Sequence, residues 1–161
     1  MKASRVHDVV AALLAEVVDG PPPDAAFILN PGDKGLLGSL DALSAAAASE
    51  RPDGRSSVAA HVDHLRYGLE LLNRFARGDN SWSEANYSAS WQRQRVDAGD
   101  WQALRAALAA EAHAWIAAAR EDREWDDLTL TATMASLAHL AYHLGAIRQL
   151  SLLYLALFIL Q

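Results

Sequence analysis

The sequence predicts an all-α protein, most simply a single four-helix bundle. Three observations support this fold class. Hydrophobic residues make up 52% of the chain, alanine is abundant and β-branched residues are sparse outside a few short runs, a composition that favours helix over sheet. Four long segments carry apolar residues at helical spacing. No internal repeat or low-complexity linker divides the 161 residues, so residues 1–161 are expected to form one domain with a substantial core.

The first two long helices lie in the N-terminal half. The first is expected over residues 4–18 and ends at "DGPPP" (19–23), because proline cannot continue a helix. A short extra helix, at about 36–43, is expected to pack over one end of the core. The second long helix starts after Ser56 or Ser57, either of which is a good N-cap. It is expected to continue to about Arg77.

The last two long helices follow a long connection. Residues 81–100, "SWSEANYSASWQRQRVDAGD", are polar and aromatic without a sustained period, which predicts a connection that crosses the bundle between the second and third helices. Asp100 is expected to cap the third helix. Thr131 or Thr133 is expected to open the fourth and longest helix, which extends to about Phe158. These connections leave an up-down-up-down arrangement open.

Charge and cysteine content narrow the classes of partner and site. The formal net charge is −6, and no basic run is present, which argues against a nucleic-acid partner. The chain has no cysteine. Disulfides and cysteine-ligated zinc are therefore excluded, and any site for a soft metal must be built from histidine.

The two ends of the chain predict a cytoplasmic protein that does not enter the membrane. The N-terminal segment contains His7, Asp8 and Glu16, which come too early for a secretory signal. The apolar run at 150–160 is too short to span a bilayer core of about 30 Å. This run is expected to be a core segment or the contact surface of a homodimer.

Two histidines one helical turn apart indicate a metal site. His139 and His143 lie in "HLAYHLGAIRQL" and share one helix face. They can direct ring nitrogens at one ion about 2.0–2.1 Å from each. If the second and fourth helices are neighbours, an imidazole from the second helix completes a three-histidine set with an open coordination position. This arrangement is associated with catalytic zinc.

A structural role for the same histidines is the alternative. A pair at this spacing can arise by chance, and the rings can hydrogen-bond one another and nearby backbone. However, each buried imidazole without a partner costs roughly 1–3 kcal/mol, against a total stability of about 5–15 kcal/mol. Several such rings need a shared reason to be buried, and a bound cation supplies one.

These segments resemble the DinB-like (DinB/YfiT) superfamily of four-helix bundles. The resemblance rests on "SVAAHVDHLRYGLELLNRF" and "LAHLAYHLGAIRQL", with "NPGDKGLLGSLDALS" and the tryptophan-rich connection, and it covers most of the chain. The family motif H-x-x-x-H-[RL]-G-[QA]-I matches His139, His143, Gly145 and Ile147. The resemblance implies that His64, His139 and His143 bind a divalent metal, zinc or nickel. Their affinity for it is expected to fall below about pH 6.5, as the imidazoles protonate.

The resemblance also implies a class of chemistry. Family members transfer low-molecular-weight thiols such as bacillithiol to electrophiles, or use mycothiol in an isomerisation. This implies a metal-dependent thiol transferase or hydrolase that acts on a small-molecule substrate. Many members have Arg-Gly-Gln where this chain has Leu144, Gly145 and Ala146, which predicts a less polar pocket here. The alternative is a non-catalytic bundle, with a structural metal or none, that acts as a small-ligand-binding or homodimeric stress-related protein.

No catalytic residue is assigned from the sequence. His61 is a candidate for a contact that supports the metal ligands, for a substrate contact or, if the helix is rotated, for an alternative ligand. Tyr142 is a second candidate for a supporting contact, and Tyr67 and Tyr142 are expected to pack or to line the pocket. Asp63 and Glu70 are expected to face water.

The remaining histidines and the tryptophans are expected to be structural. His7 and His113 have no counterpart in the family motif and are expected to be surface or packing residues. The tryptophans are expected to close the ends of the bundle and cover the core rather than stack on a substrate. They are Trp82, Trp91, Trp101, Trp115 and Trp125.

Overall fold

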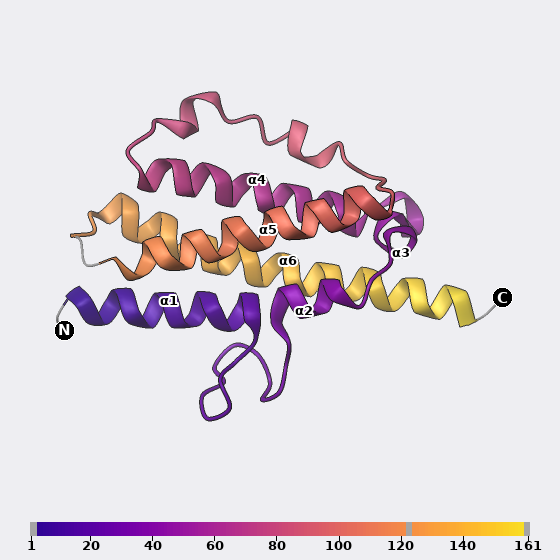
Figure 1. Cartoon of the computed structure of the whole chain (residues 1–161), viewed down its shortest axis with the longest axis horizontal. Helices are drawn as coiled ribbons and strands as arrows, with labels where there is room; N and C mark the ends of the chain where they lie inside the picture. Colours follow the sequence, from indigo (N-terminus) through magenta and orange to yellow (C-terminus); the bar gives the residue numbers. More distant parts are fainter. Residues whose placement is uncertain (1–2, 122–123, 160–161) are drawn as a thin grey trace.

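The computed structural model describes residues 3–121 and 124–159, and no β-strand occurs in these two ranges. The all-helical fold predicted from the sequence is therefore confirmed (Figure 1). The long helices are α1 (Ala3–Asp19), α4 (Val58–Ala76), α5 (Ala98–Arg120) and α6 (Asp127–Ile159). The short ones are α2 (Gly35–Asp41), α3 (Ala45–Ser49) and the 3₁₀ turns η1 (Pro52–Gly54), η2 (Ser81–Glu84) and η3 (Ala89–Trp91).

The four long helices form a bundle in which α4 and α1 each pack against both α5 and α6. The second and fourth predicted helices, α4 and α6, are thus neighbours. They run in opposite directions, since His61 contacts His143 and His64 contacts His139. In contrast, α4 and α5 are parallel, as Figure 1 shows. The order of directions is therefore up-down-down-up, rather than the up-down-up-down arrangement that the sequence left open.

The parallel pair requires a long return of the chain. Residues 77–97 run back along α4 from its C-terminal end to the start of α5 (Figure 1). This 77–97 connection confirms the crossing segment predicted between the second and third long helices. Near its C-terminal end, the Gln94 side chain accepts a hydrogen bond from the Ser57 N–H, at 2.9 Å. The connection is thereby fixed beside the first turn of α4.

Side-chain caps decide where the long helices begin. Ser57 accepts a hydrogen bond from the Ala60 N–H and caps α4, one of the two caps predicted. The prediction that Asp100 caps the third helix is wrong, because Asp97 caps it by accepting from the Asp100 N–H. The fourth helix begins before Thr131, because the Asp126 carboxylate accepts from the N–H of Thr129. In both cases an aspartate reaches the N–H three residues ahead.

The loop between α1 and α2 is anchored by a buried carboxylate. Glu16, on α1, is 2% exposed, and its Oε1 accepts hydrogen bonds from the backbone N–H groups of Phe27, Ile28 and Leu29, at 2.7–2.9 Å. Burial raises the pKa of this carboxyl, but the three N–H groups outweigh burial and lower its pKa from the usual value. The loop after "DGPPP" is thus held on α1 by a charged acceptor.

A second anchor joins the end of this loop to α6. Asp33 accepts hydrogen bonds from Arg148, at 2.6 Å, and from the Gly35 N–H, at 2.8 Å. The Arg148 guanidinium lowers the pKa of the Asp33 carboxyl. Arg148 also donates to the Ser39 hydroxyl on α2. The short extra helix predicted after the first long helix is therefore fixed against the fourth.

The core is built from the inner faces of the long helices together with α2. Trp101 and Trp115 are buried in it, and their indole N–H groups donate to the Leu43 carbonyl and the Ser136 hydroxyl. The prediction that tryptophans cover the core is confirmed for these two. Trp125 packs by stacking on His7, which is 3% exposed, with ring centroids 4.2 Å apart.

The C-terminal end of α6 extends past the other long helices (Figure 1). Leu152 is 59% exposed there, and the side chains of residues 155–161 lie outside the described part. A homodimer contact at this end stays a prediction. Among the residues described, no helix combines the length and the apolar character needed to cross a bilayer.

Candidate metal centre

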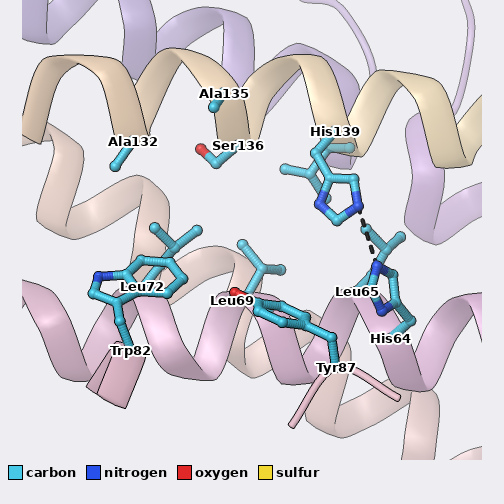
Figure 2. A pocket seen from close by; sticks show the side chains of 12 residues that line it. His64, Leu65, Leu69, Leu72, Trp82, Tyr87, Ala132, Ala135, Ser136 and His139 are labelled. Carbon is cyan, nitrogen blue, oxygen red and sulfur yellow. Dashed lines mark hydrogen bonds between the residues drawn. The ribbon is translucent and has the colours of Figure 1, made fainter. Parts of the chain in front are cut away.

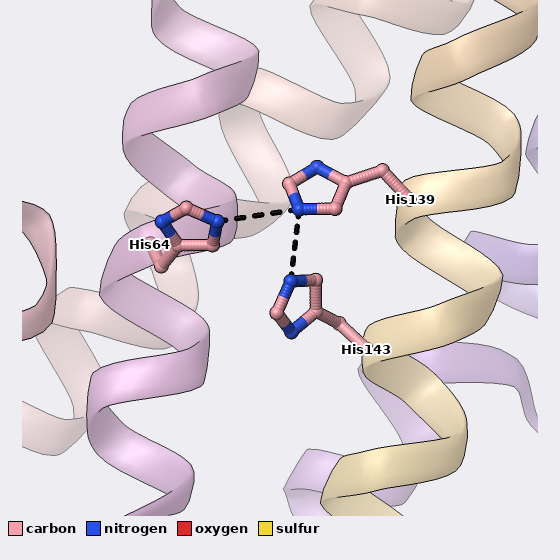
Figure 3. A group of neighbouring side chains, drawn as sticks. All are labelled: His64, His139 and His143. Atoms are coloured by element: carbon pink, nitrogen blue, oxygen red, sulfur yellow. Dashed lines mark hydrogen bonds between the residues drawn. The ribbon is translucent and has the colours of Figure 1, made fainter. Parts of the chain in front are cut away.

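Three imidazoles from two helices converge on one point between α4 and α6 (Figure 3). His64 comes from α4, and His139 and His143 come from adjacent turns of α6. The Nε2 atom of His139 lies 3.2 Å from Nε2 of His64 and 2.8 Å from Nε2 of His143. These residues, called the three-histidine cluster below, each offer one nitrogen, and all three nitrogens lie within 4.8 Å of one another. The cluster therefore contains the residues predicted from the sequence.

The spacing of these nitrogens suits a tetrahedral cation. Ligand nitrogens about 2.0–2.1 Å from a tetrahedral ion are separated by about 3.3 Å, close to the two distances in the cluster. All three residues present the same ring atom, Nε2, to the common point. Three imidazoles with a fourth position free are also the ligand set of a catalytic zinc site. The residues present fit a divalent metal.

The partner of His64 fixes which of its nitrogens is available. Its Nδ1 lies 2.9 Å from the Ser90 hydroxyl, and that hydroxyl donates to the Tyr87 carbonyl at 2.7 Å. The hydroxyl must therefore accept from the His64 Nδ1–H, which leaves a lone pair on Nε2 of the neutral ring. A single proton on His139 Nε2 can satisfy only one of its two histidine neighbours. A cation at the centre would satisfy all three lone pairs.

The cluster is held neutral by its surroundings. Burial, reinforced by His139 and His61, lowers the pKa of His64 to about 4. Burial, reinforced by the other three rings, lowers the pKa of His143 to about 3, and burial also lowers the pKa of His139. The rings are thus ready to act as ligands at neutral pH. Competition between protons and metal is expected well below the pH of about 6.5 predicted from the sequence alone.

His61 lies next to the cluster and contacts one of its members. Its Nδ1 is 2.8 Å from Nδ1 of His143. Because His143 turns Nε2 toward the cluster, a neutral His143 with a free Nε2 lone pair carries its proton on Nδ1 and donates it to His61. His61 therefore orients His143, as ligating histidines commonly require. Tyr142, the other residue predicted to support a metal ligand, is 71% exposed. Its ring and that of His143 are nearly perpendicular, with centroids 5.1 Å apart.

Sequence reasoning missed the contribution of the 77–97 connection. Besides Ser90, the connection places Trp91 against the cluster, where its ring stacks on His64 with centroids 4.3 Å apart. The Trp91 and His61 rings also contact each other in a T-shaped arrangement, with centroids 5.0 Å apart. For Trp91, the expectation of a purely structural tryptophan is incomplete. No signal in the sequence links Ser90 to His64, because Ser90 lies 26 positions further along the chain, in a segment without a sustained period.

Two acidic residues on α4 were expected to face water, and one of them does not. Asp63 is 8% exposed and forms ion pairs with Arg66 at 3.0 Å and with Arg93 of the connection at 3.3 Å. It is buried because the connection covers it. Glu70 is half-buried, with its side chain 39% exposed, and pairs with Arg66. The Tyr67 hydroxyl accepts from the Asn86 N–H, so it too holds the connection.

A pocket of about 390 Å³ lies between α4, α6 and the connection, and two members of the cluster line it while His143 does not (Figure 2). His64 and His139 are its polar end, and the Trp82 ring lies at the opposite end (Figure 2). The pocket is lined by His64, Leu65, Gly68, Leu69, Leu72, Trp82, Tyr87, Ala132, Ala135, Ser136, His139 and Leu140. A ligand in this space would have direct access to the point on which the Nε2 atoms converge.

The two remaining histidines lie apart from the cluster. His113, on α5, is exposed and contacts Asp19 at 2.9 Å, and His7 is buried against Trp125. Their predicted surface and packing roles are confirmed.

Fold and site together define a helical bundle with a three-histidine cluster that could hold a divalent metal and that opens into a pocket. Comparisons with protein-family models, with curated proteins and with solved structures find no match for this chain.

Proposed function

We propose that this chain is a metal-dependent enzyme of the DinB-like type, in which His64, His139 and His143 hold zinc or nickel. The observation that carries the proposal is the convergence of three Nε2 atoms beside a pocket that two of the three histidines, His64 and His139, line. A purely structural site would have no need of an adjoining cavity. The resemblance of both histidine-bearing segments to that superfamily supports the same function.

The chemistry would be activation of a nucleophile. A divalent cation with one open position lowers the pKa of a bound water to about 7, or binds a thiol as the thiolate. Of these two, we propose thiol transfer to an electrophile, because a chain without cysteine must take its sulfur nucleophile from a bound molecule. Hydrolysis by metal-bound water is the second candidate.

The chain's own residues would have distinct roles in this reaction. The His64, His139 and His143 rings provide neutral nitrogen ligands, Ser90 fixes the tautomer of His64, and His61 accepts the proton of His143 Nδ1. Trp91 stacks on His64 and covers the cluster from the side of the connection. The apolar walls of the pocket exclude water from the reacting molecules.

Metal content tests the proposal directly. We expect the purified protein to bind one divalent ion per chain by elemental analysis, and chelation to lower its melting temperature. His139→Ala should abolish binding. His113→Ala, which removes an exposed histidine outside the cluster, should leave it unchanged. A protein that takes up no metal, and that melts identically with and without chelator, would refute the proposal and favour the metal-free bundle.

A further inference from the structure

We propose that the pocket beside the three-histidine cluster binds a compact, uncharged and largely apolar molecule, which reaches the centre of the cluster through a single ligating atom. This inference rests on the proposed function, in that a metal occupies the cluster and a thiol is the group that ligates it. It adds the chemical class of the substrate.

The charge of the lining restricts which molecules the pocket can bind. None of the twelve side chains that line the pocket is an aspartate, glutamate, lysine or arginine. The nearby charged residues of α4 are committed elsewhere, since Asp63 pairs with Arg66 and Arg93, and Glu70 pairs with Arg66. Away from the metal, a carboxylate or ammonium group inside the pocket would lose its hydration without gaining an ion pair with a side chain, which is strongly unfavourable. The pocket therefore discriminates against charged molecules.

The pocket also offers a ligand few hydrogen-bond partners. The Ser136 hydroxyl donates to the Thr133 carbonyl and accepts from the Trp115 indole N–H, so its one proton is already used. His64 Nδ1 is bound to Ser90, and His64 Nε2 and His139 Nε2 face the centre of the cluster. The remaining lining is aliphatic except for Trp82 and Tyr87, which carry an indole N–H and a hydroxyl at the wall formed by the connection. A ligand would find its main polar partner at the metal.

The size and shape of the pocket limit the ligand to a small molecule. Gly68 on α4 faces Ala132 and Ala135 on α6, and these small residues leave the space between the two helices open. At about 30 Å³ per heavy atom, the volume of a water molecule in the liquid, a pocket of about 390 Å³ holds roughly a dozen heavy atoms. Trp82 and Tyr87 provide aromatic surface at the wall formed by the connection (Figure 2). An aryl or short alkyl group suits this space.

Two thiols that differ in the group they carry provide the test. The protein is loaded with cobalt(II), whose visible spectrum changes when a thiolate coordinates, and is titrated with 2-phenylethanethiol and with 3-mercaptopropionate. Both are alkanethiols of similar acidity, but only the second carries a carboxylate. We expect 2-phenylethanethiol to bind at least about tenfold more tightly than 3-mercaptopropionate, because the pocket buries its ring. Equal affinities, or tighter binding of the carboxylate thiol, would overturn the inference and leave the proposed function intact.

A pair of variants on α6 tests whether the pocket causes this preference. Ala135→Leu fills the pocket one turn before His139 without removing a ligand. Ala138→Leu makes the same substitution at an exposed position outside the lining. We expect the preference to fall several-fold in Ala135→Leu alone. A preference that survives Ala135→Leu would refute the assignment to this pocket. If cobalt binds but neither thiol changes the spectrum, both the thiol chemistry and this inference fail.

Discussion

The orientation of His143 depends on a residue that is not itself a ligand. His61 accepts from the Nδ1 of His143 across 2.8 Å, and this contact turns Nε2 toward the other two rings. A histidine at a metal site that loses such a partner can rotate or change its tautomer. We therefore treat His61 as a positioning residue.

His61→Phe should weaken metal binding without abolishing it. Loss of the acceptor for His143 is expected to reduce metal affinity by roughly 10–100-fold, the usual effect of removing such a partner. Competition with a chromophoric chelator measures the change. His61→Gln keeps an acceptor oxygen and should recover part of the affinity. If His61→Phe instead removes the metal as completely as His139→Ala does, His61 would be a ligand and this assignment would be wrong.

At the scale of single residues, the histidines of the cluster could be predicted from the sequence, but the residues that contact them could not. His139 and His143 share a face because a helix repeats every 3.6 residues, so their proximity depends on local geometry alone. His64 required the further knowledge that α4 and α6 are neighbours, which the resemblance supplied. Ser90 and Trp91 contact His64 only because the chain folds back across α4. That path is set by tertiary packing, and sequence periodicity does not record it.

At the scale of elements, the parallel α4–α5 pair explains why the connection covers the site. A chain that leaves the end of one helix and enters its parallel neighbour must return along the full length of the first. Here the return passes over the side of α4 that carries His61 and His64, and it is held there by the Asp63–Arg93 pair and by Gln94.

Helix caps explain why two predicted helix starts were wrong. Asp97 and Asp126 cap the third and fourth long helices, and both lie before the polar residues that were expected to cap them.

The loop between α1 and α2 should depend on one carboxylate. Glu16→Ala removes the acceptor of three backbone N–H groups, and we expect it to lower the free energy of unfolding by roughly 2–4 kcal/mol, since hydrogen bonds to a charged group are strong and buried donors would be left unpaired. Urea unfolding of the variant and of the unmodified chain measures the difference in free energy of unfolding. Asp8→Ala, at an exposed position of the same helix, should change stability by less than about 0.5 kcal/mol. Similar values for both variants would contradict the anchoring role.

At the scale of the whole molecule, the buried histidines make the metal-free protein sensitive to acid. The pKa values of His64 and His143, about 4 and about 3, lie below the ordinary value of 6.5. Between these values and 6.5 the unfolded chain binds more protons than the folded one, so stability falls as the pH is lowered. Glu16 and Asp33, whose pKa values are lowered from the carboxyl range, add a further loss only at more acidic pH.

Urea unfolding of chelator-treated protein between pH 7 and pH 4.5 tests this window. We expect the free energy of unfolding to decrease steadily below about pH 6.5 in the unmodified chain. The double variant His64→Gln/His143→Gln should show a flatter profile over the same range, because two of the titrating rings are gone. A profile for the unmodified chain that is level down to pH 5 would mean that these rings are already protonated in the folded state.

The separation of the ligands along the chain has a consequence for folding. His64 and His139 are 75 residues apart in sequence, and a single ion held by both would close that length of chain into a loop. Because the unfolded chain does not bring the two ligands together, the ion would bind the folded state alone and stabilise it by RT ln(1 + c/Kd), where c is the free metal concentration, or about 4 kcal/mol when c is a thousandfold above Kd. In a chain without cysteine, coordination would thus link segments that are distant in sequence, as disulfides do in secreted domains.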